Sequence, residues 1–351
     1  MATPNEPQRD ETGTSGAGSH PRFPAPPPGR TGWPWTGDMD DRPLEPLARD
    51  GRTPRITVIT PSFNQGAFLE ESIRSILLQD HQNIEYFVID GGSSDSSVEI
   101  IRRYAPWLAG WVSEPDDGQA DAVNKGFDLA TGEYLCWLNS DDVLYQGFLA
   151  RRVEEFSTRP DTALIYGDVH AGWDRRLCGE ICGEPVSYLD MLRTLRVSIP
   201  QQSAVWRRSV VDEVGPLDAR WRVVLDRDFF IRVARRRGLE YIPGAVGFFR
   251  QHETAKSVAE MSAWVDEVPQ LYSEFFRRDD LTDVERRLER ETMANAHLLC
   301  ADISRNLRDW PGFLDHLGSA LKWKPVHATS AFLRARLAGF GRRLRHRGSS
   351  A

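Results

Sequence analysis

Two adjacent carboxylates, Asp141 and Asp142, directly follow an apolar run that ends at Leu138. Like charges at the edge of a low-dielectric core repel each other, so such a pair needs a cation or a proton. A divalent cation is the simplest solution, because carboxylate oxygens suit Mg²⁺ or Mn²⁺, which complete their shells with water and substrate phosphates. We expect the metal at Asp141 first. In the alternative, Asp142 caps a helix that begins near Tyr145, and Asp141 faces water.

Polar residues also follow three other apolar runs, at 56–60, 85–90 and 110–114. Each of these runs precedes a stretch in which apolar residues recur at helical spacing. Four strand–helix alternations in about 100 residues predict an α/β fold with a mostly parallel, right-handed wound sheet. Ligands of such sheets bind beyond the carboxyl ends of the strands, so we expect acids from three loops to meet at one edge.

Three longer stretches occur in order: TPSFNQGAFLEESIRSILLQ, VIDGGSSDSS and SEPDDGQADAVNKGFDLATGEYLCWLNSDD. Together they resemble the inverting glycosyltransferases of family 2, and the resemblance covers roughly residues 56–255. It implies the GT-A fold, with a Rossmann-like sheet flanked by helices. It also implies a nucleotide-diphosphate sugar as donor, a divalent metal held at an Asp-x-Asp motif, and inversion at the anomeric carbon.

The same resemblance implies a set of donor-side residues, carried over by position. They are Thr60, Pro61 and Asn64 beside the nucleotide, Asp90 at its base, Asp117 and Lys125 in the donor pocket, and Asn139, Ser140 and Asp141 at the motif. The motif departs from the family pattern, because Asn139 replaces its first Asp and carries no charge. The metal is therefore expected at Asp141 and Asp142.

Inverting transfer also needs a base that takes the proton of the acceptor hydroxyl. The segment VLDRDFFIRVARR at 224–236 resembles the family segment that supplies this base, which places the role on Asp226, with Asp228 as the rival. A carboxylate with a pKa near 4 is a weak base at pH 7, so burial or neighbouring acids should raise that pKa. In the alternative, Asp226 is the N-cap of a helix and Asp228 interacts with the helix dipole.

Two further groups of residues come from the later part of the chain. FFRQHETAKS at 248–257 resembles the stretch that closes these catalytic domains, which makes His252 a third metal ligand; a structural histidine is the alternative. Gln201, Gln202 and Trp206 precede the base and are assigned to the acceptor side, where an aromatic face suits a sugar. Packing of Trp206 in the core is the alternative.

Composition narrows the classes of partner. Lys and Arg total 44 against 51 Asp and Glu, for a formal net charge of −7, so we expect no binding to nucleic acid. The four cysteines form no CxxC pair, and no apolar run approaches the roughly 20 residues of a membrane-spanning helix. The N-terminus lacks the apolar core of a signal peptide. We therefore expect a cytoplasmic protein.

Changes in composition divide the chain into four parts. Residues 1–52 are rich in Pro, Gly and Ser and are predicted to be a disordered leader, before a catalytic domain at 53–260 and a helical appendage at 261–330. Residues 331–351 form a basic amphipathic tail, and no acid follows Asp315. Two interpretations of the tail stay open: peripheral contact with an anionic membrane at its inner face, or a merely solvated helix.

We therefore predict a metal-dependent, inverting glycosyltransferase of the hexosyltransferase type that acts in polysaccharide, glycolipid or cell-envelope glycan synthesis. A nucleotidyltransferase is the first alternative, but the loop PSFNQG has one Gly and no Lys or Arg. A non-catalytic carbohydrate-binding protein of the same fold would have no need of Asp141, Asp142 and Asp226. An NAD-dependent oxidoreductase is the weakest candidate, because GGSSDSS is not a GxGxxG fingerprint.

Overall fold

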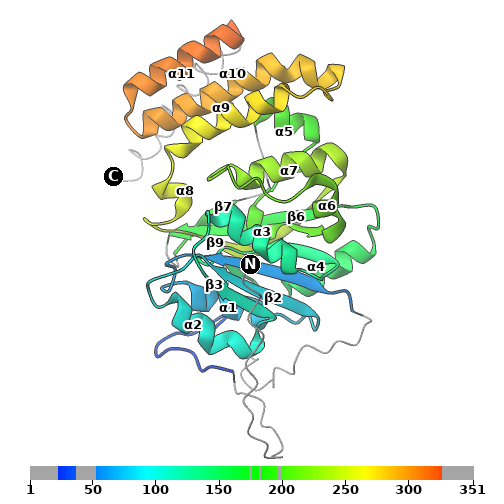
Figure 1. The fold of residues 1–351 in the computed structure, drawn as a ribbon, viewed down its shortest axis with the longest axis vertical. Helices are drawn as coiled ribbons and strands as arrows, with labels where there is room; N and C mark the ends of the chain where they lie inside the picture. The colour runs from blue at the N-terminus through cyan, green and yellow to red at the C-terminus, as the bar shows by residue number, and fades with distance from the viewer. Residues whose placement is uncertain (1–22, 37–52, 174–175, 182, 196–198, 326–351) are drawn as a thin grey trace, which may run out of the picture.

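One central sheet with helices packed around it makes up most of the molecule (Figure 1). The computed structural model describes residues 23–36, 53–173, 176–181, 183–195 and 199–325. The strand order is β3-β2-β1-β4-β8-β6-β9-β5, and β7 pairs with β6. The predicted α/β fold with C-terminal helices is confirmed.

The first four strands form a parallel unit. β1 (Ile56–Ser62) pairs with β2 (Ile84–Asp90) and β4 (Tyr134–Trp137), and β2 pairs with β3 (Gly110–Ser113). All seven residues of β1 are buried, as expected for a parallel strand covered on both faces. The connections contain α1 (Leu69–Leu77), α2 (Ser97–Tyr104), the short turn η1 (Ala105–Trp107) and α3 (Gln119–Leu129).

The second half of the sheet is mixed rather than parallel. β8 (Val205–Arg207) runs antiparallel to both β4 and β6 (Leu164–Trp173), whereas β6 and β9 (Leu239–Gln251) are parallel. β5 (Val143–Leu144) and β7 (Arg176–Ile181) add antiparallel edges. The helices of this half are α4 (Phe148–Ser157), α5 (Tyr188–Thr194), the turn η2 (Gln201–Ser203), α6 (Arg208–Val214) and α7 (Leu225–Arg236).

An aromatic cluster joins the two halves. The rings of Trp137 and Trp206 have centroids 5.2 Å apart, and Trp206 lies 5.2 Å from Phe229 of α7. Both tryptophans are almost fully buried. Burial of large aromatic side chains contributes strongly to stability. The cluster therefore fixes α7 against the end of β4, where the predicted site begins.

The C-terminal helices lie together at the end of the molecule farthest from α1 and α2 (Figure 1). They are α9 (Ala263–Phe276), α10 (Asp283–Asn306) and α11 (Trp310–Trp323), whereas the short α8 (Lys256–Ala259) that precedes them lies closer to the sheet (Figure 1). A capping box formed by Thr282 and Glu285 begins α10. Within the described residues, no helix is long and apolar enough to cross a membrane. The predicted tail at 331–351 lies outside those residues.

Part of the predicted disordered leader is packed on the catalytic domain. The guanidinium of Arg74 in α1 donates hydrogen bonds to the carbonyl oxygens of Pro24 (2.7 Å), Pro34 (3.1 Å) and Trp35 (3.3 Å). Trp35 is only 3% exposed, and Trp33 Nε1 donates to the carbonyl oxygen of Leu144 at 2.7 Å. This corrects the prediction of disorder for residues 23–36 and agrees with the alternative that Trp33 and Trp35, which are unusual in such a tail, dock on another surface. Residues 1–22 and 37–52 lie outside the described part.

Candidate active site

Buried amide donors and a buried arginine surround the second carboxylate at the end of β4. Asp142 is fully buried; its Oδ1 accepts from the backbone N–H of Arg250 (2.9 Å), and its Oδ2 accepts from Gln202 Nε2 (2.8 Å). The Arg250 guanidinium donates to the carbonyl oxygen of Asp141 (2.8 Å) and to Glu71 (3.0 Å). Burial, followed by the charge of Asp141, raises the pKa of the Asp142 carboxyl well above its ordinary value.

These contacts change the expected role of Asp142. Both of its oxygens accept hydrogen bonds from buried groups and its side chain is fully buried, which does not fit the role of metal ligand that the sequence predicted. It does not cap a helix either, because α4 has Gly147 at its N-cap. The neighbouring Ser140 is also buried. Asp142 therefore anchors the loop that carries Asp141.

Asp141 and His252 converge from two elements. His252 Nε2 lies 3.0 Å from Asp141 Oδ2, and His252 Nδ1 lies 2.9 Å from Thr254 Oγ1. The Phe68 ring, with its centroid 4.5 Å from that of His252, packs against the imidazole. Among the described residues there is no group of three or more His, Cys, Asp or Glu that could hold a metal. Two donors nevertheless fit Mg²⁺ or Mn²⁺, which use few protein ligands and fill the remainder with water and substrate phosphates.

The loops after β1 and β2 are bonded to each other. Asn64, at φ 52°, donates its backbone N–H to Ser93 Oγ (2.7 Å) and accepts from the Ser94 N–H (2.9 Å). Asp90, fully buried, accepts from the Ser93 N–H (2.9 Å) and from the Ser113 hydroxyl (2.8 Å). The structure therefore brings Asn64 and Asp90 together at the carboxyl edge, as predicted.

Other predicted donor-side residues lie in β1, in the β3–α3 loop and in α3. Thr60 and Pro61 are buried near the carboxyl end of β1, and the Thr60 hydroxyl accepts from Tyr86 OH at 3.0 Å. Asp117 is exposed in the β3–α3 loop, and Lys125 makes ion pairs with Glu114 and Asp121 (Nζ to carboxylate, 3.1 and 3.4 Å).

Asp116, which the sequence analysis did not select, packs more closely on the Asp90 loop. A Cβ at Gly91 would lie 2.7 Å from Asp116 Oδ2, so this approach of the two loops requires a glycine. Burial raises the pKa of the Asp116 carboxyl. Asp116 and Asp117 are adjacent acids in the sequence, and the contact with the β2 loop and the partial burial of Asp116 distinguish them in the structure.

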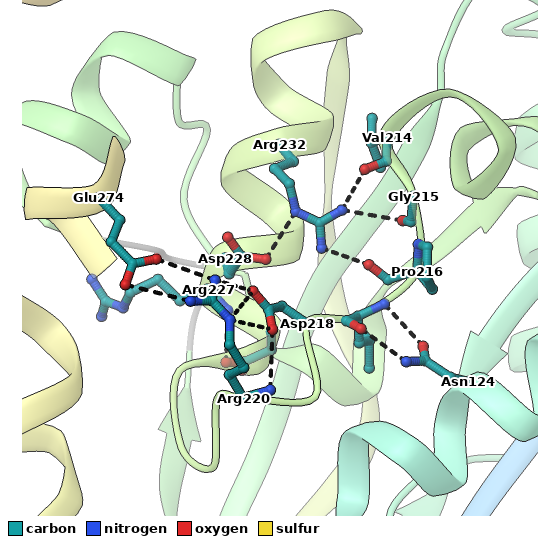
Figure 2. A network of polar contacts seen from close by, with 12 residues as sticks. Asn124, Val214, Gly215, Pro216, Asp218, Arg220, Arg227, Asp228, Arg232 and Glu274 are labelled. Atoms are coloured by element: carbon teal, nitrogen blue, oxygen red, sulfur yellow. Dashed lines mark hydrogen bonds and ion pairs between the residues drawn. The ribbon is translucent and has the colours of Figure 1, made fainter. Parts of the chain in front are cut away.

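The two candidate bases have different surroundings, and Figure 2 shows those of Asp228. Asp228 Oδ2 accepts from Arg232 Nε at 2.8 Å, and the same guanidinium donates to the carbonyl oxygens of Gly215 (3.1 Å) and Pro216 (2.8 Å). Asp226 accepts from the Arg227 N–H (2.7 Å). Burial raises the pKa of both carboxyls, and at Asp228 the charge and hydrogen bond of Arg232 oppose that rise. Asp226 is not the N-cap, which is Val224. Asp228 is thus part of an ion pair that fixes the α6–α7 loop.

The sequence of this chain is similar to those of known glycosyltransferases. Residues 57–215 match the model of the family described as glycosyl transferase family 2. A "PGL/p-HBAD biosynthesis glycosyltransferase" of Mycobacterium tuberculosis is 34% identical over 184 residues, which are 51% of this chain and 69% of that protein. The chain belongs to glycosyltransferase family 2.

Solved structures place this glycosyltransferase in the GT-A fold, as predicted. Staphylococcus aureus TarS 1–349, solved in complex with UDP-GlcNAc, aligns with a TM-score of 0.60 at 15% identity, over 79% of this chain and 83% of that one. The mannosyltransferase PcManGT of Pyrobaculum calidifontis, solved with GDP-Man and Mn²⁺, aligns with a TM-score of 0.54 at 21% identity, over 80% of each chain.

The residues predicted for the acceptor side of this family 2 enzyme are structural. Trp206 is fully buried in the aromatic cluster, so the core-packing alternative describes it. Gln202 bonds Asp142, and Gln201 Nε2 donates to the carbonyl oxygen of Trp137 at 2.7 Å. All three are 8% exposed or less and present no face to a sugar. The side-chain amides of Gln201 and Gln202 instead hold the end of β4.

The glycosyltransferase also uses a residue of α9 that sequence reasoning missed. The Glu267 carboxylate accepts from three consecutive backbone N–H groups, of Arg222 (3.0 Å), Val223 (2.9 Å) and Val224 (3.2 Å). This segment directly precedes Asp226. No local pattern reveals the contact, because the partners are 43 to 45 residues apart in the chain.

Proposed function

We propose that this chain is a metal-dependent, inverting glycosyltransferase that moves one sugar from a nucleotide-diphosphate donor to a hydroxyl acceptor. The observation that carries this proposal is that two acids on different elements have different partners. Asp141 pairs with His252 at 3.0 Å, whereas Asp226, on another element, is a separate carboxyl with a raised pKa. The pair of Asp141 and His252 suits a divalent cation, whereas the Asp226 carboxyl suits acceptance of a proton.

Asp226 is the proposed base. Its carboxylate takes the proton of the acceptor hydroxyl while that oxygen forms a bond to the anomeric carbon of the sugar. The bond from the anomeric carbon to the diphosphate oxygen breaks on the opposite face, so the configuration inverts. A positioned base contributes about 10²–10⁴-fold to such a rate. A raised pKa makes the carboxylate a stronger base at neutral pH.

Asp141 and His252 are the proposed ligands of Mn²⁺ or Mg²⁺. When bound, such a cation neutralises negative charge on the departing diphosphate. Arg250 and Asp142 hold the Asp141 loop in place through their buried contacts, so the ligand is positioned before the donor arrives. The Mn²⁺ and GDP-Man in the related mannosyltransferase structure support this choice.

The proposed acceptor class is a glycan or lipid-linked hydroxyl in polysaccharide, glycolipid or cell-envelope synthesis. We further propose that residues 53–260 and the helical part at 261–330 act together, because Glu267 of α9 bonds the segment that precedes Asp226. The helical part then belongs to the catalytic scaffold.

A panel of UDP- and GDP-sugars, each with and without Mn²⁺, tests the function. Release of nucleoside diphosphate and thermal stabilisation should both occur for one donor class and should depend on Mn²⁺. Asp141→Ala should weaken the Mn²⁺-dependent binding, whereas Asp279→Ala, on an exposed acid of the helical part, should not. Binding of no activated sugar by the parent protein would reject the proposal, and NMR of the product's anomeric proton tests inversion.

A further inference from the structure

Lys256 connects three segments at the carboxyl edge of the sheet. It is the first residue of α8 and is half-buried. Its Nζ donates to Gln119 Oε1 at 3.1 Å, and Gln119 Nε2 donates to Asn139 Oδ1 at 2.7 Å. Asn139 Nδ2 in turn lies 3.4 Å from Asp142 Oδ2. The ammonium is therefore two hydrogen bonds away from the loop that carries Asp141.

The other cations near this edge are already engaged. Arg250 is 2% exposed and bonds Glu71 and the Asp141 carbonyl. Lys125 has two carboxylate partners, and Arg227 donates to the carbonyl oxygen of Leu195 and to Tyr272 OH. Lys256, by contrast, bonds a neutral carboxamide and has no carboxylate within 4.0 Å among the described residues. An ammonium has three donors, so two of them remain for a ligand.

We propose that Lys256 binds the diphosphate of the nucleotide-sugar donor, with Gln119 as its partner in the free enzyme. This inference rests on the proposed function. A lysine ammonium binds phosphate as a point charge. The charge on the leaving diphosphate grows as its bond to the sugar breaks, so this contact strengthens during transfer.

The surroundings of Lys256 favour an anionic ligand. Burial lowers the pKa of its ammonium, which means that the charge is poorly solvated in the free protein. Glu260, Glu267 and Asp226 oppose this effect, and Arg222 adds to it. An entering phosphate would replace the missing solvation. Lys256 also acts on Asp226, because its charge lowers the pKa of that carboxyl.

Binding of mono- and diphosphates separates this contact from general damage. UMP, UDP, GMP and GDP are titrated, with Mn²⁺ present, into the parent, Lys256→Met, Lys256→Arg and Lys322→Met. Loss of a charged hydrogen bond should reduce the preference for diphosphate over monophosphate about tenfold or more in Lys256→Met. Lys256→Arg should keep most of the preference. Lys322→Met, on exposed α11, should keep all of it.

Each outcome decides a different point. A parent that binds no nucleoside diphosphate contradicts the proposed function and this inference together. An unchanged diphosphate preference in Lys256→Met, in a parent that binds UDP or GDP, contradicts the role of Lys256 alone, as does an equal loss for mono- and diphosphates. Should Lys256→Met not unfold cooperatively, Lys256→Gln, which keeps hydrogen-bonding capacity without the charge, replaces it under the same criteria.

Discussion

Carboxylates of the same chemical type do different work here because their partners differ. Asp142 is buried with two amide donors, and Asp228 is paired with Arg232. Asp141 pairs instead with the imidazole of His252, and Asp226 accepts from a neighbouring backbone N–H. Burial raises the pKa of both carboxyls of α7, and only Asp228 is paired with a guanidinium, which favours its charged form and makes it the poorer base. The assignment of roles follows from these partners.

Replacement of the two neighbouring acids of α7 tests that assignment. Asp226→Asn should reduce the rate of transfer about 10²- to 10⁴-fold and leave donor affinity unchanged, because only proton acceptance is lost. Asp228→Asn is the matched variant; it should change the rate little, since Arg232 keeps its bonds to backbone carbonyls. Initial rates and donor dissociation constants measure both effects. Equal losses of rate in the two variants would remove Asp226 from the role.

The pH dependence of transfer follows from the same carboxyl. A base works when deprotonated, and burial raises the pKa of the Asp226 carboxyl above the ordinary value of an aspartate. Activity should therefore fall as the pH decreases, and the midpoint of this loss should lie above the ordinary pKa of an aspartate. Because the charge of Lys256 lowers this pKa, Lys256→Met should move the acidic limb of kcat/KM to higher pH. A limb that stays in place or moves to lower pH would contradict the coupling; Lys322→Met is the control.

At the scale of elements, the sequence predicted the parallel unit better than the remainder. β1, β2 and β4 are apolar runs with a helix after each, so their pattern is local. β8 has only three residues, and its antiparallel partners are set by tertiary packing. Trp206 lies in this short strand and Gln202 lies beside it, so their burial also depends on tertiary packing, and the sequence pattern wrongly placed them on the acceptor side. Arg250 had a visible signal, as an arginine at the end of the apolar run GFFR.

Helix α9 is predicted to position the base through Glu267. Glu267→Gln leaves one carbonyl oxygen where a carboxylate accepted three N–H groups, so the segment before Asp226 should loosen. We expect kcat to fall about tenfold with the donor dissociation constant unchanged, from the loss of charged hydrogen bonds. Glu274→Gln, on the same helix, is the control, because its pair with Arg220 is at the surface (Figure 2). A fall in Glu274→Gln that matches Glu267→Gln would contradict the positioning role.

The packed stretch at 23–36 should contribute to stability. Deletion of residues 1–36 removes three carbonyl acceptors from the buried Arg74. It also exposes to water the surface on which Trp35 packs. Arg74 keeps its bond to Tyr104 OH but loses these acceptors and the packing of Phe23 and Trp35, so the free energy of unfolding should fall by about 3 kcal/mol. Deletion of residues 1–22 keeps these contacts and serves as the control. Urea unfolding measures both, and equal curves for the two deletions would show that the stretch contributes nothing.

At the scale of the whole molecule, charge and apolar surface are unevenly distributed. The chain carries a formal net charge of −7, yet no acid follows Asp315. Trp310 is 57% exposed and Leu314 is 64% exposed, one helical turn apart on α11. The chain then continues into a basic segment. Its arginines are Arg334, Arg336, Arg342, Arg343, Arg345 and Arg347.

An apolar helix surface followed by a basic segment is suited to an anionic bilayer. The parent protein should therefore sediment with vesicles that contain phosphatidylserine and not with phosphatidylcholine vesicles. Each Lys or Arg near such a surface contributes about 1 kcal/mol, and salt weakens the attraction. Deletion of residues 331–351 should release the protein, and Leu314→Glu should weaken binding less. Vesicle binding that persists unchanged after the deletion would leave the tail a solvated segment, and the acceptor would then have to reach the enzyme without its help.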